Sequence, residues 1–144
     1  MNTFDKLIGI VLIVVIAALI CTIVYLSLVP NPKDRFTEFY ILNTDGKAYN
    51  YPGNATAGVP LEVIIGIANH ERKSLDYTVK IVADRQELKV IKFGKLVDGD
   101  KREEKISFIP LSAGKDSKIQ FFLFTDAGAE PHLKHPLVLV LDVE

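Results

Sequence analysis

Two histidines, His132 and His135, are the residues of this chain best spaced to share a metal ion. On a helix, a separation of three residues places both imidazoles on one face, and imidazole nitrogens are good zinc ligands. Pro131 and Pro136 bracket the pair in "AEPHLKHP", however, and prolines so placed disfavour a helix. Zinc would also need carboxylates from distant parts of the chain. We therefore expect a loop here and no metal site.

Two further polar stretches resemble ligand-binding loops. Asp98 and Asp100 in "VDGDKREE" are spaced as in a calcium loop, but the remaining EF-hand positions are not filled. This stretch is predicted to be a hairpin turn with solvated charges. The stretch "NHERK" at residues 69–73 is predicted to be a polar turn. Its alternative role is contact of Arg72 and Lys73 with lipid headgroups or an acidic glycan.

Nucleophilic catalysis needs a nucleophile with a paired base, and no local motif supplies a Ser/His/Asp set. A glycine-rich phosphate loop is also missing from the sequence. We therefore expect a protein that is not an enzyme and needs no cofactor. The 17 basic and 18 acidic residues give a formal net charge of -1, so no basic field exists for nucleic acid. Cys21 is the only cysteine, which excludes an internal disulfide.

The most apolar segment is Leu7–Val29, "LIGIVLIVVIAALICTIVYLSLV", which contains no charged residue. As a helix it would be roughly 34 Å long, enough to cross a hydrocarbon core of about 30 Å. A cleaved signal peptide is the alternative, but its apolar region is usually about 7–15 residues and ends at a small-residue site, which "YLSLVPNP" lacks. We predict a flank at residues 1–6 and a transmembrane helix at residues 7–29.

The side of the membrane on which the C-terminal part lies is not given by charge. Lys6 and the amino terminus precede the apolar segment, and Lys33 and Arg35 follow it, so the positive-inside rule favours neither orientation. A sequon at Asn54 in "YNYPGNATAGVP" suggests N-glycosylation, which would require an external domain. The alternative is a purely structural turn. We predict a single-pass protein of the cell membrane with an extracytoplasmic C-terminal domain.

Residues 30–35 begin with "PNPKD" and are predicted to be a short, stiff linker, because proline breaks the helix. Beyond them, in residues 36–144, apolar residues alternate with a period of two and turn signals separate the runs. This pattern predicts an all-β fold, a seven-stranded immunoglobulin-like β-sandwich. The predicted strands are Phe36–Leu42, Leu61–Ala68, Leu75–Asp84, Gln86–Phe93, Glu103–Pro110, Lys118–Thr125 and Leu137–Val143.

Alternation also predicts which residues face the core. In "LKVIKF" the phase changes between Val90 and Ile91, where we expect a bulge or bend. The predicted core residues are Leu61, Val63, Ile65, Ile67, Tyr77, Val79, Ile81, Ala83, Ile106, Phe108, Ile119, Phe121 and Leu123.

Two predicted strands are apolar on both faces. In "QFFLF", Phe122 and Phe124 point away from the core, and Val138 and Val140 do so in "PLVLVLDV". The outer faces of a two-sheet sandwich are normally wet, so something is expected to cover these side chains. One interpretation is that loops or neighbouring strands cover them. The other is a docking face for a membrane or envelope protein, or for a second copy of the chain.

Residues 36–71, "FTEFYILNTDGKAYNYPGNATAGVPLEVIIGIANHE", resemble the family called domain of unknown function 1616, archaeal predicted membrane proteins. The matching features are "FTEFYIL", a YP-x-N-x-T-x-G motif and "GIANHE". Later, "SFIPLSAGKDSKIQFFLF" is similar to the closing pattern of the family. The resemblance implies a membrane-attached, immunoglobulin-like domain in an archaeal setting, and implies no known activity.

These observations predict a non-enzymatic, membrane-anchored interaction module or accessory subunit at the cell surface. Its partners are expected to be the lipid bilayer and a membrane or envelope protein, or another copy of itself, and not nucleic acid. An alternative is a module that binds envelope polysaccharide through Tyr49 and Tyr51, with Asn50 and Asn54 beside them. A third hypothesis is a subunit of a membrane enzyme complex.

Overall fold

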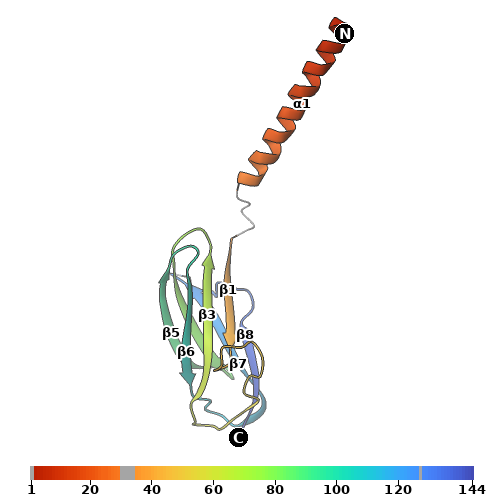
Figure 1. The fold of residues 1–144 in the computed structure, drawn as a ribbon. Helices are drawn as coiled ribbons and strands as arrows, with labels where there is room; N and C mark the ends of the chain where they lie inside the picture. Colours follow the sequence, from red (N-terminus) through yellow and green to blue (C-terminus); the bar gives the residue numbers. More distant parts are fainter. Residues whose placement is uncertain (1, 30–34, 127) are drawn as a thin grey trace. The chain divides into compact units, whose positions relative to one another are not determined.

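The computed structural model describes residues 2–29, 35–126 and 128–144 (Figure 1). The chain divides into two compact units, Met1–Asp34 and Arg35–Glu144. Except for Arg35, the linker predicted at residues 30–35 lies outside the described residues, as does Met1 of the predicted flank.

The first unit contains one helix, α1, Thr3–Leu28, with a mean hydropathy of 3.3 in its most apolar window. The hydroxyls of Thr22 and Ser27 donate to carbonyls four residues earlier, at 2.8 and 2.9 Å. These polar side chains are thus satisfied within the helix, as a hydrocarbon environment requires. By length and composition α1 is suited to cross a membrane, and an N-terminal signal sequence would meet the same test.

The second unit is built from strands, because its apolar residues alternate rather than recur at helical spacing. Each of the seven predicted strands is present. A short strand of two residues was not predicted, which makes eight among the described residues. The strands are β1 Phe36–Leu42, β2 Asn54–Ala55, β3 Leu61–His70, β4 Leu75–Ala83, β5 Gln86–Leu96, β6 Lys101–Phe108, β7 Gly114–Thr125 and β8 Leu137–Val143.

The strands form two sheets, in the orders β1-β3-β6 and β2-β8-β7-β4-β5 (Figure 1). All neighbours are antiparallel except β2 and β8, which are parallel. Buried side chains from both sheets join in one hydrophobic core. Phe108 of β6 meets Phe121 of β7 edge to face, with ring centroids 5.8 Å apart. This geometry is favourable for aromatic pairs.

The predicted core residues are buried or pack against the core. Leu61 and Ala83 are only partly buried, because each stands at the end of a strand. Burial of one large apolar side chain is worth about 1.5–3 kcal/mol, so this cluster supplies the main driving force for folding.

The bulge predicted between Val90 and Ile91 is wrong. Both residues pair regularly with β4, and their side chains alternate, with Val90 43% exposed and Ile91 9% exposed. The two register shifts lie on either side, where Leu88 and Phe93 are the additional residues of β5. Gly94, with φ of 76°, allows the chain to turn after the second shift.

Asn69 is a fully buried polar residue at the end of β3, within the stretch predicted to be a polar turn. Its side-chain nitrogen donates to the carbonyls of Lys73 and Leu96, both at 2.8 Å. Its side-chain oxygen accepts from the backbone N–H of Glu71 at 2.9 Å. Asn69 therefore ties the loop after β3 to the end of β5.

Candidate functional site

The side of the five-stranded sheet that points away from the core is the candidate interaction site, and we call it the outer face. The residues predicted for such a face all lie on it. Phe122 and Phe124 on β7 are half-buried, whereas Val138 and Val140 on β8 are 48% and 49% exposed. The buried residues that alternate with them fill the core, which is why these four side chains point outward.

Strand register makes the outer face continuous. Lys80 of β4 lies opposite Val90 of β5 and Phe122 of β7. The Lys80 ammonium lies 4.8 Å from the centroid of the Phe124 ring, a cation–π contact. Further cross-strand neighbours on this face are Thr78 opposite Lys92 and Phe124, Gln120 opposite Val82 and Val138, Lys118 opposite Val140, Glu87 opposite Val82, and Lys95 opposite Asp76.

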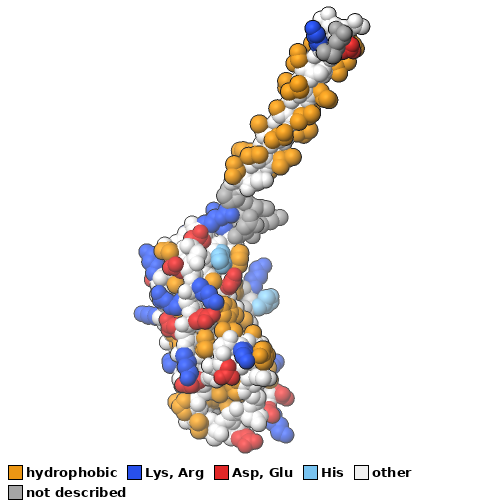
Figure 2. Space-filling model, in the orientation of Figure 1, with side chains coloured by type: hydrophobic (Ala, Val, Ile, Leu, Met, Phe, Trp, Pro, Cys, Tyr) orange, Lys and Arg blue, Asp and Glu red, His pale blue; other side chains and the backbone are white. Residues whose placement is uncertain are grey.

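An apolar groove of about 290 Å³ adjoins the outer face between β1 and β8. Figure 2 shows hydrophobic side chains over this part of the domain. At the groove, the Tyr51 hydroxyl donates to the Ile41 carbonyl at 2.7 Å. The groove is lined by Phe39, Tyr40, Ile41, Ala48, Tyr51, Leu137, Val138 and Leu139. Val138 belongs to both surfaces, so the groove extends the outer face around the edge of the sheet.

His132 belongs to a polar cluster and not to a pair with His135. Its Nε2 lies 3.0 Å from Glu71 Oε1 and 3.1 Å from Thr37 Oγ1. The Tyr77 hydroxyl lies 3.0 Å from the same Thr37 oxygen. His135 is exposed. Among the described residues no group of three metal-ligating side chains is close enough to hold an ion.

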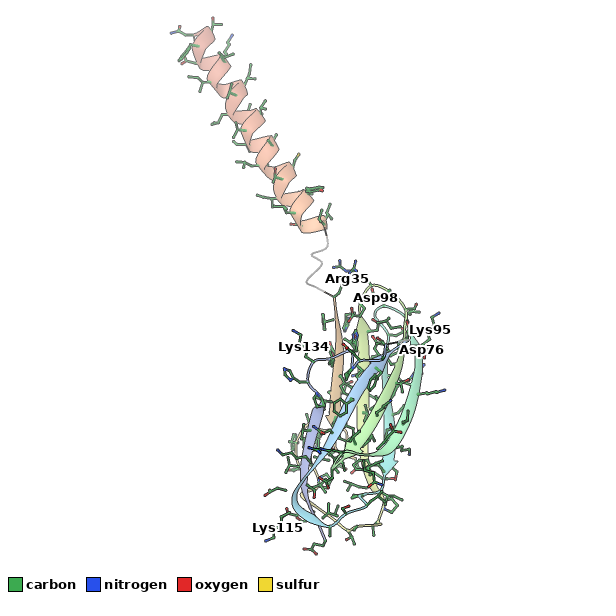
Figure 3. All side chains as sticks on the ribbon, turned by 180° about the vertical axis from the view of Figure 1, so that it is seen from behind. Arg35, Asp76, Lys95, Asp98, Lys115 and Lys134 are labelled. Atoms are coloured by element: carbon green, nitrogen blue, oxygen red, sulfur yellow. The ribbon has the colours of Figure 1, made fainter. Side chains whose placement is uncertain are left out.

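The polar cluster joins β1, β4 and the loops after β3 and β7, so it fastens the end of the domain at which β1 begins. Figure 3 places Lys134 of the second loop at the same end as Arg35, and Lys115 at the opposite end. Sequence analysis missed this cluster. The one feature of the sequence that could have indicated it is Thr37, a polar residue at an inward-facing position of β1, two residues before Phe39 and four before Ile41.

Burial raises the pKa of the Tyr77 phenol, and the nearby Glu71 charge adds to this. The folded-state pKa is therefore above the unfolded value of about 10, so this group's contribution to stability is complete below pH 10 and is lost as pH rises further.

We expect the free energy of unfolding to fall above pH 10, by up to about 1.4 kcal/mol per pH unit, and to fall less steeply in Tyr77→Phe. Urea denaturation from pH 8 to 11.5 measures this, with the half-exposed Tyr49→Phe as the control. An unchanged slope in Tyr77→Phe would contradict the assignment.

The opposite surface, the outer side of the three-stranded sheet, has a different character. Its charged side chains neutralise one another, and Figure 2 shows acidic and basic groups interspersed there. Exposed pairs of this kind are well solvated and contribute little to binding or stability. The ion pairs are Glu62 with Lys105 at 2.6 Å and Glu103 with Lys101 at 2.9 Å. On the same surface, Glu38 Oε1 lies 3.2 Å from His70 Nε2.

Tyr40 lies across the same surface, directly over Gly66 of β3. A Cβ at Gly66 would come within 2.2 Å of the Tyr40 ring. The Tyr40 hydroxyl donates to Glu103 Oε1 at 2.7 Å, and this bond is the main cause that lowers the pKa of Glu103. Only glycine leaves room for the ring at this position, so Gly66 and Tyr40 act as a pair.

A second, polar hollow of about 450 Å³ lies beside the loop after β1. Of the residues predicted to contact glycans, Asn50 lines it and Tyr49 is 55% exposed. Tyr51 is only half-buried, but its hydroxyl is already bonded to Ile41. The hollow is lined by Asn43, Thr44, Asp45, Asn50, Pro52, Pro60, Leu61 and Glu62.

Asn54 lies on the two-residue strand β2, opposite Asp142 of β8, and is exposed. Its side chain is accessible to modification. Glycosylation at Asn54 stays a prediction.

A family model described as domain of unknown function (DUF1616) matches residues 30–140. No curated protein matches the chain. Solved structures are similar at low identity. The crystal structure of the CARDB domain of the PF1109 protein from Pyrococcus furiosus, in complex with di-metal ions, has a TM-score of 0.52 and 9% identity, with 79% of this chain and 97% of that chain covered.

The solution NMR structure of the same Pyrococcus furiosus domain has a TM-score of 0.50 and 10% identity, with 76% of this chain and 96% of that chain covered. At such identity the similarity concerns the fold alone. CARDB domains are immunoglobulin-like, so this chain combines an immunoglobulin-like β fold with one apolar N-terminal helix.

Proposed function

The chain belongs to the DUF1616 family, a domain of unknown function, and from this premise we propose that it is a non-enzymatic interaction module at the cell surface. In this proposal α1 is an uncleaved anchor and the two sheets form an extracytoplasmic β-sandwich. The module would act as an accessory subunit of a membrane or envelope protein. The similarity to CARDB domains, a non-catalytic domain type, agrees with this class of function.

The contrast between the two outer surfaces carries the proposal. The three-stranded sheet presents ion pairs that are complete within the chain, Glu62–Lys105 and Glu103–Lys101. The outer face instead presents Phe122, Phe124, Val138 and Val140, with an apolar groove at its edge. A contiguous apolar surface beside a solvated one marks a site of protein contact, and aromatic side chains supply much of the energy at such sites.

The mechanism proposed is display of this surface from the membrane. The anchor confines the domain to two dimensions near other membrane proteins, which raises the effective concentration of a partner. The phenylalanines would act as anchors of the contact, while the half-exposed valines and the groove complete its apolar area.

We expect the double variant Phe122→Asp, Phe124→Asp to lose a stoichiometric partner that co-purifies with the wild type. The full-length tagged protein is extracted from its native membranes in mild detergent, and retained proteins are quantified by mass spectrometry. Loss of two central aromatic contacts, about 2 kcal/mol or more each, should reduce retention at least tenfold.

The matched control is Ile64→Asp, which places one aspartate at a partly buried apolar position of the other sheet. It should keep the partner. Circular dichroism of each variant confirms folding. Equal retention by the wild type and the double variant would show that the outer face is not the contact site, and the absence of any partner would remove the accessory role.

A second candidate function is binding of envelope polysaccharide. The polar hollow favours it, since amide and carboxylate groups from Asn50, Asp45 and Glu62 surround a space large enough for a sugar ring. Tyr49 is the one exposed aromatic of the predicted pair. Glu62 is already paired with Lys105, and the Tyr51 hydroxyl is already bonded to the Ile41 carbonyl. Few polar groups at the hollow are therefore left to bind a sugar, which makes this function the second candidate.

A further inference from the structure

Lys80, Lys92 and Lys118 stand among the apolar residues of the outer face, and we infer that the partner of this face is a protein surface on which carboxylates are set among apolar side chains. The inference rests on the proposed function, because it names the partner chemistry of the same face.

Each lysine borders the apolar part of the face. Lys80 is half-buried at the middle of β4, between Val90 and Phe122 on the neighbouring strands. Lys118 lies opposite Val140 and is exposed. A partner that covers the phenylalanines and valines would therefore cover these ammonium groups as well.

Among the residues that the structure describes, no carboxylate forms an ion pair with Lys80, Lys92 or Lys118. The nearest described compensation for Lys80 is the Phe124 ring. Covering an ammonium group without a counter-charge costs free energy, and a carboxylate on the partner would offset that cost. On the opposite surface of the domain, by contrast, Lys101 and Lys105 already have carboxylate partners.

A second copy of the chain fits this face poorly. Two copies joined by a two-fold axis present the same patch to each other. With Lys80 in the middle of the patch, such a contact would bring two uncompensated ammonium groups together. Like charges across an interface are unfavourable and select against that partner.

An anionic bilayer also fits poorly, because acidic residues stand on the same face. Asp76 alternates with Thr78 on β4, and Asp142 alternates with Val140 on β8, and both are exposed. Figure 3 shows Asp76 beside Lys95 at one end of the domain, with Lys115 at the other. A uniformly negative surface would repel these carboxylates, whereas a protein surface places its charges individually.

Zero-length cross-linking with a carbodiimide tests this inference, because the reagent joins an amine to a carboxylate only where they are in contact. Native membranes that contain the full-length tagged protein are treated and then solubilised, and the cross-linked peptides are identified by mass spectrometry. The Lys105–Glu62 pair, at 2.6 Å, gives an internal link that reports that the reaction has worked. We expect Lys80, Lys92 or Lys118 to be joined to Asp or Glu of a different protein.

The double variant Lys80→Gln, Lys118→Gln should lose these links, and it should retain about tenfold less of the partner than the wild type does. Retention by this variant should also fall less steeply than that of the wild type as the salt concentration rises. Lys105→Gln, on the other surface, should leave the partner in place. The inference is overturned if the lysines link only to copies of this chain, or if the partner depends on Phe122 and Phe124 but not on the lysines. A preparation with no partner at all would overturn the proposed function itself, so the two failures are distinguishable.

Discussion

The substitution Asn69→Asp is expected to destabilise the domain by about 3–5 kcal/mol, because it removes one member of a buried, fully bonded polar set. The amide nitrogen that donates to Lys73 and Leu96 would be replaced by an oxygen facing two carbonyls at 2.8 Å. Thermal unfolding of the purified protein should show a fall in Tm of roughly 10–20 °C. The difference in Tm between the wild type and Asn69→Asp should become smaller at low pH, where a protonated carboxyl group at position 69 can donate one of the two hydrogen bonds.

The same change at an exposed asparagine provides the control. Asn50 is exposed in the loop after β1, and Asn50→Asp should alter the free energy of unfolding by less than about 0.5 kcal/mol. A Tm of Asn69→Asp within 3 °C of the wild type, a margin of roughly 0.5 kcal/mol, would show that Asn69 does not hold the loop after β3 to the end of β5.

Gly66→Ala is expected to cost about 1–3 kcal/mol, because the added Cβ would meet the Tyr40 ring at 2.2 Å and force it from the surface. The displaced ring would also lose its hydrogen bond to Glu103. Urea denaturation measures the change, and the midpoint should fall while the m-value stays constant.

A double-mutant cycle separates this steric cause from a general intolerance of β3. In the Tyr40→Ala background there is no ring to displace, and Gly66→Ala should then be neutral or stabilising by about 0.5–1 kcal/mol, since glycine weakens a strand. The coupling energy should be about 1–4 kcal/mol. A Gly66→Ala change that is equally costly in both backgrounds would locate the problem elsewhere.

Local patterns in the sequence predicted the positions of the longer strands along the chain well. Seven strands lie where alternation placed them, and inward residues such as Val63, Tyr77 and Phe121 are buried. The family resemblance is confirmed by the match over residues 30–140. Alternation succeeds because each strand must bury one face, whatever its partners are.

Features that depend on which strands meet could not be predicted. β2 was missed because two residues carry no periodicity, and its pairing with β8 depends on tertiary contacts alone. The buried role of Asn69 depends on the end of β5, 27 residues away in sequence. The Tyr40–Gly66 pair and the polar cluster around Thr37 likewise join residues that only the register of β1 with β3, or the packing of loops, brings together.

The fastening of β1 has a mechanical consequence. β1 is the strand through which the apolar helix connects to the domain, and all seven of its residues pair with β3. If a partner holds the outer face, a force applied to the chain at Phe36 would act along β1. The hydrogen bonds between β1 and β3 would then bear the force together, in shear, rather than break one at a time. The hydrogen bonds of Thr37 in the polar cluster and the Tyr51–Ile41 hydrogen bond would have to break at the same time. Under the proposed function, this pairing would let the domain bear tension between the membrane and the partner of its outer face.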